Sequence, residues 1–346
     1  MKRQILILYT GGTIGMRSSA QGYVPDDGFE ALLKAQLDTR PADQLPDYQL
    51  LGFEQLIDSA NLTTDDWSKI GQTLLDNWNG YDGFIVLHGT DTMAYTASAL
   101  SFILQGMDKP VIVTGSQVPL SELRNDALDN LVTSMMLAGN YKIPEVCVYF
   151  NGRLLRGNRS KKTKSTGFDA FDSPNFPWLG EVGINIGLRP ELILSPEKPG
   201  FKLPVYQPDA VVMVQTYPGI PARIIDSLID TEEVRALILQ SYGVGNPPDK
   251  NQALITSLEK ATGRGIVVVN LSQCYQGSVY QGAYATGATL NRLSVIPGAD
   301  LTLEATFAKL HHLIGLGYDA ERIRQQITTP LAGECRFADQ NSFACP

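Results

Sequence analysis

The feature that most constrains the fold is a repeated alternation of short apolar runs with longer amphipathic stretches. In the first half of the chain the apolar runs, which are typical of buried parallel strands, are 4–9, 83–87, 110–114 and 146–150. Between them lie stretches with helical periodicity, several preceded by Asp, Ser or Thr as candidate caps: 28–37, 64–78, 92–104 and 124–138. Strands that alternate with helices predict an α/β fold with a parallel sheet.

A second α/β segment follows a proline-rich interruption. Residues 174–208 break both periodicities, so we expect loops and short edge strands that lead into a linker. The pattern then restarts, with strands expected at 210–215, 234–240 and 265–271 and helices at 221–229, 251–261, 302–313 and 319–327. A chain of 346 residues has room for about two domains. We therefore expect a larger N-terminal domain at 1–190, a linker at 191–208 and a smaller C-terminal domain at 209–346.

The composition argues against several classes of protein. Hydrophobic residues make up 43% and charged residues 18%, which is typical of a soluble globular chain. The net charge of -8 gives little support to a nucleic-acid-binding surface and favours a small-molecule substrate. The apolar run at 5–8 is too short for a signal-peptide core or a membrane span. We therefore expect a cytoplasmic protein with neither nucleic acid nor membrane as a partner.

The cysteines and histidines argue against a metal site. Only three histidines occur, and no paired Cys-x-x-Cys is present. The histidines are His88, His311 and His312, and the scattered cysteines are Cys147, Cys274, Cys335 and Cys345. We expect no metal, four free thiols, and a weakly ordered tail after Gly333 that carries the last two of them.

Three motifs that follow the apolar runs carry unusual chemistry. In open parallel sheets, sites form beyond the carboxyl ends of the strands. TGGTIG at 10–15 combines a tight glycine turn with the hydroxyl of Thr13. HGTDT at 88–92 places Thr90 and Asp91 at a helix start, and GSQ at 115–117 adds Ser116. Taken singly, each motif also fits an ordinary explanation: a strand turn for the first and third, and a helix cap for Asp91.

The glycine turn does not match a nucleotide-binding motif. Its spacing is not G-x-G-x-x-G, and no Gly-Lys-Ser/Thr follows. The polar stretch at 16–28 contains Gly and Pro, so we expect a flexible loop there instead of a dinucleotide-binding helix. A nucleotide-binding oxidoreductase is therefore disfavoured.

A basic loop at 156–164 supplies candidate bases. A threonine hydroxyl is a weak nucleophile unless a neighbouring base takes its proton. The loop offers Lys161, Lys162 and Lys164, although a solvated charge run is the ordinary explanation for any one of them. A lysine made neutral by desolvation and oriented by Asp91 would complete a Thr–Lys–Asp relay. His88 adjoins HGTDT but lacks an obvious Ser or Cys partner, which disfavours it as a base.

Together, the motifs TGGTIG, HGTDT, TGSQ and RGNRSKK resemble, in this order, the bacterial-type L-asparaginases and specifically their cytoplasmic type I branch. The resemblance extends over most of the chain, including DGFIVLHGTDTMAYTASALSF, KPVIVTGSQVP, GFDAFDSPN, SYGVGN and RGIVVVNLSQC. It implies the asparaginase/glutaminase fold of two α/β domains with parallel sheets. It also implies hydrolysis of the side-chain amide of L-asparagine to L-aspartate and ammonia through a threonine acyl-enzyme, without metal or cofactor.

The resemblance also implies a role for each catalytic residue. Thr13 would be the nucleophile on a loop that closes over substrate, with Tyr23 as its closing partner and proton acceptor. Thr90, Asp91 and Lys162 would form a second group, in which Thr90 and Lys162 activate the water that releases aspartate. The division of roles between the two threonines is left open.

The expected substrate contacts come from the same strand ends. Asp58 and Ser59 in LIDSANLT resemble the substrate loop of the family, and Asp91 would bind the α-ammonium group. Thr90 and Ser116 complete the expected substrate-binding set. Ala60 and its neighbour Asn61 stand where periplasmic relatives carry Gln-Asp, so selectivity for asparagine over glutamine does not follow from the resemblance.

Two further expectations concern assembly and regulation. In the family a neighbouring subunit completes each active site, which implies a homodimer or a dimer-of-dimers tetramer. Some type I members are activated by asparagine at a second site, and the positions that carry Thr and Arg in them are Lys161 and Gln240 here. Gln240 cannot bind a carboxylate as a guanidinium does, so we predict weak or no activation.

Other functions remain as alternatives. The same chemistry could act on glutamine, or could supply ammonia as a subunit of an amidotransferase that modifies charged transfer RNA. The negative charge and the lack of an added RNA-binding segment argue against the amidotransferase. A non-catalytic amino-acid sensor has no use for Thr13, Thr90 and Lys162 together, although the fold alone cannot exclude it.

Overall fold

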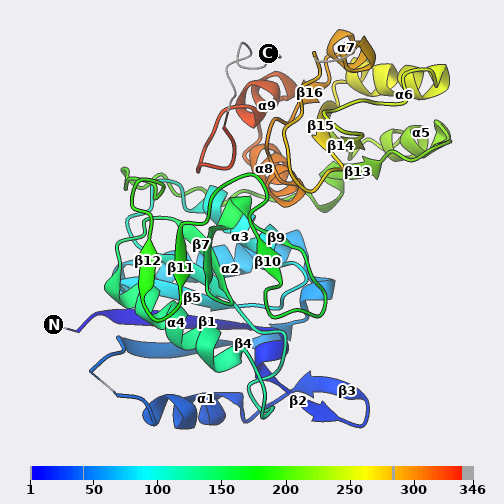
Figure 1. Ribbon diagram of the computed structural model, residues 1–346. Coiled ribbons are helices and arrows are strands. Elements are labelled where there is room, and N and C mark those ends of the chain that lie inside the picture. The colour runs from blue at the N-terminus through cyan, green and yellow to red at the C-terminus, as the bar shows by residue number, and fades with distance from the viewer. Residues whose placement is uncertain (1, 42, 283–284, 337–346) are drawn as a thin grey trace. The chain divides into compact units, whose positions relative to one another are not determined.

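The computed structural model describes residues 2–41, 43–282 and 285–336, and the chain divides between Leu203 and Pro204 into two compact units (Figure 1). Both units combine a sheet with helices on its faces. Leu192 and Ile193 pack against one hydrophobic core of the first unit, and Phe201 and Leu203 pack against the other. The stretch at 191–203 therefore lies within the first unit. No helix in the described ranges is long and apolar enough to cross a membrane.

The first unit is built on an eight-stranded sheet with the strand order β12-β11-β8-β7-β6-β5-β1-β4. Its parallel strands are β1 (Gln4–Gly11), β4 (Asp47–Ile57), β5 (Gly83–Leu87), β6 (Val111–Thr114) and β7 (Val146–Phe150). The antiparallel strands are β8 (Arg153–Arg156), β11 (Gly180–Val182) and β12 (Ile186–Leu188). The four expected strands and the short edge strands in the proline-rich stretch are confirmed. β4 was not expected, because its half-exposed sequence contains no continuous apolar run.

Helices cover both faces of this sheet. Helices α1 (Phe29–Asp38) and α4 (Ala127–Asn140) pack on one face, against Ile5 and Ile7 of β1. Helices α2 (Thr64–Asn77) and α3 (Met93–Ile103) pack on the other, against Leu6 and Leu8. Alternate residues of one strand thus enter two separate cores, as a sheet that is buried on both faces requires. All four expected helices are confirmed, with ends that differ by at most three residues.

The stretch after Gly15, expected to be a flexible loop, is instead a β-hairpin of β2 (Met16–Ser19) and β3 (Gly22–Pro25), in which Ser18 pairs with Tyr23 (Figure 1). Gly22 closes the turn with φ 104°, and the hydroxyl of Ser19 donates to its carbonyl at 2.6 Å. The expectation was wrong because the strands are short and exposed, so hydrophobic alternation does not mark them. A second small sheet pairs β9 (Lys161–Lys162) with β10 (Phe171–Asp172).

The second unit is a four-stranded parallel sheet with helices on both faces. Its strands are β13 (Val211–Gln215), β14 (Ala236–Ser241), β15 (Val267–Ser272) and β16 (Ile296–Pro297). Helices α5 (Arg223–Ile229) and α6 (Gln252–Gly263) pack on one face, and α8 (Leu303–Gly315) and α9 (Ala320–Ile327) pack on the other. These elements were expected apart from β16 and a further helix, α7 (Ala285–Arg292).

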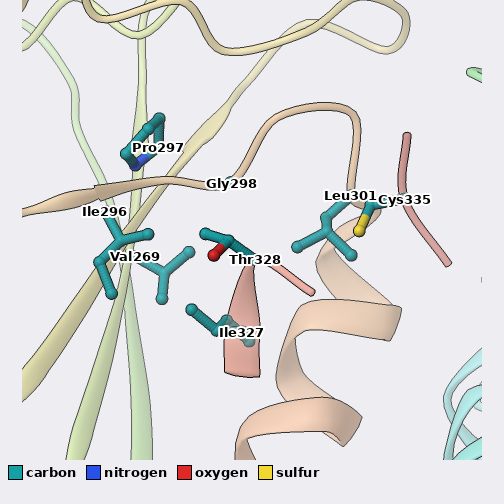
Figure 2. A pocket seen from close by; sticks show the side chains of 8 residues that line it. All are labelled: Val269, Ile296, Pro297, Gly298, Leu301, Ile327, Thr328 and Cys335. Carbon is teal, nitrogen blue, oxygen red and sulfur yellow. The ribbon is translucent and has the colours of Figure 1, made fainter. Parts of the chain in front are cut away.

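The expectation of a weakly ordered tail after Gly333 is wrong for the first residues of that segment. Glu334 and Cys335 are buried, and the Glu334 carboxylate accepts a hydrogen bond from Lys309 of α8 at 2.6 Å. Figure 2 shows Cys335 lining a small apolar pocket together with Leu301 and Ile327. Burial of an ion pair and of apolar side chains explains why this part of the tail is ordered. Cys147 and Cys274 are free thiols, and Cys345 lies outside the described residues.

Candidate active site

The motif residues gather where the parallel strands of the first unit end. β1 lies between β5 and β4 in the sheet, so the chain leaves β1 towards one neighbour and returns on the other side. Such a reversal of strand order opens a crevice at the carboxyl edge of the sheet. TGGTIG follows β1, Asp58 follows β4, HGTDT follows β5, and the GSQ turn follows β6.

Glycines allow these turns to touch through their backbones. A β-carbon on Gly12, whose φ is 92°, would lie 2.4 Å from the amide nitrogen of Gly89. A β-carbon on Gly89 would lie 2.3 Å from the Ser59 hydroxyl, and one on Gly115 would lie 2.3 Å from the carbonyl oxygen of His88. No larger residue fits any of these contacts without movement. The turns after β1, β4, β5 and β6 therefore form one continuous surface.

Lys162 connects the two polar residues of HGTDT. Its ammonium group donates to the Thr90 hydroxyl and to the Asp91 carboxylate, each at 2.7 Å. Thr90 is buried, the Lys162 side chain is 20% exposed, and the Asp91 side chain is 61% exposed. Solvent screening at Asp91 weakens the ion pair, whereas the contact with Thr90 is shielded. Lys164, an alternative base in the sequence, forms an ion pair with Asp169 instead.

A further residue, Gln117, lies against Thr90 and was given no role in the sequence analysis. The Thr90 hydroxyl donates to the Gln117 side-chain oxygen at 3.2 Å. The Gln117 amide nitrogen donates to the carbonyl oxygens of Ser165 and Gly167 at 3.2 and 3.1 Å. The sequence feature that could have indicated Gln117 is its place in TGSQ, directly after a buried strand. Gln117 thus links Thr90 to the loop that follows Lys162.

The expected substrate residues lie at the same edge. The Asp58 carboxylate caps the short helical turn at Ser59–Asn61, accepting from the amide nitrogen of Ala60 at 3.1 Å and from the Asn61 side chain at 2.9 Å. It remains exposed to solvent. Ser59 is buried, and its carbonyl accepts from the Thr92 hydroxyl at 2.8 Å. The buried Ser116 hydroxyl has no hydrogen-bond partner within the described ranges.

Thr13 and Tyr23 come from the segment that follows β1. Thr13 begins a short helical turn and is half-buried, whereas Tyr23 on β3 is 50% exposed. The segment is attached through its backbone, because Leu120 donates to the Ile14 carbonyl at 3.1 Å. The contact of Gly12 with Gly89 places Thr13 beside the Thr90 turn. Among the described residues, neither the Thr13 nor the Tyr23 side chain makes a hydrogen bond that would join it to Lys162.

His88 supports the site without facing substrate. Its Nδ1 lies 2.7 Å from the carbonyl oxygen of Gly89, and its Nε2 lies 2.9 Å from the Thr96 hydroxyl. A carbonyl only accepts, so Nδ1 carries the proton and Nε2 accepts from Thr96. Burial lowers the pKa of His88 from 6.5 to about 4, so the ring is neutral at physiological pH. Nδ1 thus holds the Gly89 carbonyl in place, and Nε2 anchors the ring to Thr96 of α3.

The arrangement contains the groups that nucleophilic hydrolysis requires. It offers two threonine hydroxyls, a lysine in contact with one of them, and an exposed carboxylate suited to an ammonium group. In the part of the chain that the structure describes, no three His, Cys, Asp or Glu side chains are close enough together to hold a metal ion.

Known proteins similar to this chain point to one family. A family model described as the N-terminal asparaginase domain matches residues 4–194, and one described as the C-terminal glutaminase/asparaginase domain matches residues 210–327. L-asparaginase 1 of Escherichia coli K12 is 48% identical over 345 residues, which cover 96% of this chain and 98% of the relative.

Solved structures agree with this result. L-asparaginase I from Vibrio cholerae matches with a TM-score of 0.90 and 43% identity, covering 97% of this chain and 100% of that chain. The thermostable L-asparaginase from Thermococcus kodakarensis matches with a TM-score of 0.86 and 30% identity, over 97% of this chain and 100% of that one. The expected two-domain α/β fold is confirmed. Because the family models and full-length relatives together span nearly all of its residues, this chain belongs to the asparaginase family and, within it, to the type I branch.

Proposed function

We propose that this protein hydrolyses the side-chain amide of L-asparagine to L-aspartate and ammonia. The observation that carries the proposal is the contact of Lys162 with both Thr90 and Asp91, since it joins a candidate base to a hydroxyl at the crevice of the sheet. L-asparaginase 1 of Escherichia coli and L-asparaginase I of Vibrio cholerae, which this chain matches over 98% and 100% of their length, support the same substrate. A pure amino-acid sensor would not need this lysine–threonine contact.

The reaction would proceed in two acyl-transfer steps. The Thr13 hydroxyl attacks the amide carbon and its proton passes to Tyr23, which relays a proton to the leaving nitrogen, so that the carbon–nitrogen bond breaks and ammonia leaves. Thr90 and Lys162 then take a proton from water as it attacks the ester. A proton passes from them to the Thr13 oxygen as the ester bond breaks, which releases aspartate and the free Thr13 hydroxyl. Backbone amides near Thr90 would stabilise the oxyanion in each step.

Substrate recognition would combine charge at the α-ammonium group with neutral polar contacts. The exposed carboxylates of Asp58 and Asp91 lie after β4 and β5, on neighbouring turns, and can approach an α-ammonium group. The buried, unpartnered hydroxyl of Ser116 and the hydroxyls of Ser59 and Thr90 supply polar contacts at the same edge. No metal or cofactor takes part in the proposed steps.

We also infer that the working form is a cytoplasmic homodimer or a pair of dimers. The exposed Asp91 and Tyr23 side chains are available for completion of the site by a second copy. Light scattering on the purified protein should give a mass of about two or four times 37.8 kDa. A mass of one chain at working concentration would contradict the inference.

The direct test is ammonia release from L-asparagine and from L-glutamine by the purified protein, beside the variant Thr90→Val. Valine keeps the shape of threonine but removes the hydroxyl that contacts Lys162 and Gln117. We expect release from asparagine, reduced by about 10²- to 10⁴-fold in the variant. Thr39→Val is the matched control, since Thr39 is exposed and donates only to the Gln36 carbonyl. No release from either amino acid by a folded sample would contradict the proposed function.

A further inference from the structure

We infer that the first unit carries a second ligand-binding site, which takes a small organic anion with a flat apolar ring. The site is a cavity of about 570 Å³ at the edge of the sheet opposite to the candidate active site. A cavity of this size suits a ligand of small-molecule dimensions. Its lining residues differ from those of the candidate active site, so the cavity is separate from the proposed hydrolysis.

The cavity lies where four neighbouring parallel strands begin. Strands β7, β6, β5 and β1 are consecutive in the sheet. Arg3 precedes β1, next to the N label in Figure 1, and Asp82 precedes β5. Pro110 directly precedes β6, and Pro144 lies two residues before β7. The motif residues follow the other ends of these strands, and β1 separates Arg3 from Gly11 by about 25 Å.

A buried ion pair holds the wall of the cavity that residues 190–196 form. The Arg156 guanidinium donates to the Glu145 carboxylate at 2.6 Å, and both side chains are buried. The other oxygen of Glu145 accepts from the amide nitrogen of Leu194 at 2.8 Å. Arg156 also donates to the Leu192 carbonyl at 2.7 Å. These charge-assisted bonds fix the wall before a ligand arrives, which lowers the entropic cost of binding.

Two of the charged groups that line the cavity already have partners within the protein. The Asp82 carboxylate accepts from the amide nitrogen of Gln4 at 2.9 Å. The Lys109 ammonium group donates to the carbonyl of Trp78 at 2.6 Å and to that of Tyr81 at 2.8 Å. These bonds fix the side of the cavity at the starts of β5 and β6. They also leave the recognition of a charged ligand to the other charged residues of the lining.

The remaining charges favour an anionic ligand. Arg3 before β1 and Lys142 after α4 line the cavity, and among the described residues neither side chain has a hydrogen bond or an ion pair. Asp108 is the one lining carboxylate in the described ranges that is likewise unpaired. Two such cations against one carboxylate make the cavity locally positive, although the whole chain has a net charge of -8. A guanidinium binds a carboxylate or a phosphate through two parallel hydrogen bonds, so Arg3, together with Lys142, would hold the anion.

The apolar part of the lining suits a flat ring. Tyr141 and Ile193 line the cavity and pack against one hydrophobic core of the first unit, which holds them in place. Four prolines complete this part of the lining: Pro110, Pro144, Pro190 and Pro196. Proline loses no side-chain entropy when a ligand packs on it, and a tyrosine ring stacks on other flat rings. The lining therefore combines cations that bind one anionic group with rigid faces that bind a ring.

The test is a fluorescence titration of the full-length protein with anilinonaphthalene sulfonate, a dye that joins aromatic rings to one sulfonate. We expect saturable binding by the wild type. Arg3→Gln and Lys142→Gln should each weaken binding about fivefold, because each removes a cation from the lining. Asp108→Asn should tighten binding about twofold, because it removes a charge that repels the sulfonate. A general loosening of the cavity would not produce effects of opposite sign.

The matched control is Lys34→Gln, because Lys34 is exposed on α1 and does not line the cavity. Its affinity for the dye should equal that of the wild type. Phenylnaphthylamine, which has the same rings without the sulfonate, should not distinguish the variants from the wild type. Phenyl phosphate and benzoate should displace the sulfonate dye, and the stronger competitor identifies the preferred anion.

Three results would overturn the inference: no saturable binding of the dye, an unchanged affinity in Arg3→Gln and Lys142→Gln, or a weaker affinity in Asp108→Asn. Displacement of the dye by neither phenyl phosphate nor benzoate would contradict the class of ligand. If circular dichroism shows that one of the two cation variants is unfolded, the other decides together with Asp108→Asn.

Discussion

At the scale of single residues, Thr13 is the side chain on which the proposed chemistry depends most. Thr13→Ala should lower kcat by about 10⁴-fold or more, because it removes the attacking atom. The midpoint of urea unfolding should stay near that of the wild type, since the Thr13 side chain is half-buried and makes no hydrogen bond among the described residues. Thr39→Ala should leave both quantities unchanged, because Thr39 is exposed and remote in sequence from the motifs. Substantial turnover in Thr13→Ala would refute the nucleophile assignment.

The sequence predicted which residue types would meet at the site but not how each would be used. Thr90 and Asp91 follow a buried strand within a specific motif, so their place at the sheet edge was predictable. The residue pattern alone did not separate Lys162 from Lys161 and Lys164. The resemblance indicated Lys162, and its contact with Thr90 depends on the segment in which β9 pairs with β10, which local periodicity does not reveal. The side chain of Gln117 is held by carbonyls about 50 residues further along the chain. Such long-range hydrogen bonds leave no local pattern in a sequence.

At the scale of elements, the turns after β1 and β5 approach so closely that position 12 should accept only glycine. Gly12→Ala should lower the free energy of unfolding by about 3 kcal/mol and reduce activity, since its β-carbon would lie 2.4 Å from the Gly89 backbone. Gly22→Ala is the matched control. Its φ of 104° carries a similar conformational cost, but its β-carbon would meet nothing within 4 Å, so we expect a loss of about 1 kcal/mol. If urea titrations give the same loss of unfolding free energy for Gly12→Ala and Gly22→Ala, the close contact with the Gly89 backbone does not contribute to stability.

The elements that the sequence predicted share one property: the apolar residues that form their hydrophobic pattern are buried. The runs at β5, β6 and β7 are buried at every position, and helix α2 begins with a capping box of Thr63 and Asp66. The hairpin β2–β3 and the strand β4 are largely exposed or half-exposed. Their formation depends on turn geometry and on neighbouring strands instead of on apolar spacing, and this is why the sequence did not indicate them.

The junction of α8 with the tail contains a buried ion pair whose loss should be costly. Lys309 and Glu334 have fully buried side chains, and Lys309 also donates to the carbonyls of Ile327 and Thr329. Glu334→Gln should lower the free energy of unfolding by about 3–5 kcal/mol, because it leaves a buried charge without its counter-ion. The double variant Lys309→Met with Glu334→Leu should cost clearly less than the single variant. If the double variant loses as much unfolding free energy as Lys309→Met and Glu334→Leu lose together when made singly, this account is contradicted.

At the scale of the whole molecule, each unit contains a histidine that makes it sensitive to acid. Burial lowers the pKa of His88 in the first unit and of His311 in the second from 6.5 to about 4. Between these pH values the unfolded chain binds more protons than the folded one. The contribution of each histidine to the free energy of unfolding is therefore fully present above about pH 6.5 and is lost as the pH falls to about 4. Each group should contribute about 3 kcal/mol to this loss.

The prediction can be checked with His311→Phe. The His311 and Phe307 rings pack edge-to-face with their centroids 4.6 Å apart, and a phenyl ring at 311 retains that contact. Urea unfolding at neutral and at mildly acidic pH should show a smaller fall in stability for the variant than for the wild type. An identical fall in both proteins would mean that the titration of His311 does not contribute.

The dependence of the rate on substrate concentration is also a property of the whole molecule, and the resemblance relates it to the positions of Lys161 and Gln240. In the resembled activated enzymes, these positions carry Thr and Arg. The backbone carbonyl of Gln240 already accepts from the Thr216 amide at 2.9 Å and from the Gln273 side chain at 3.0 Å, and its own amide cannot form a bidentate pair with a carboxylate. We therefore expect a hyperbolic dependence of the initial rate on L-asparagine, with a Hill coefficient of about 1. Initial rates from well below to well above half-saturation test this directly, and a sigmoidal curve would show that another residue has taken over the role of the missing guanidinium.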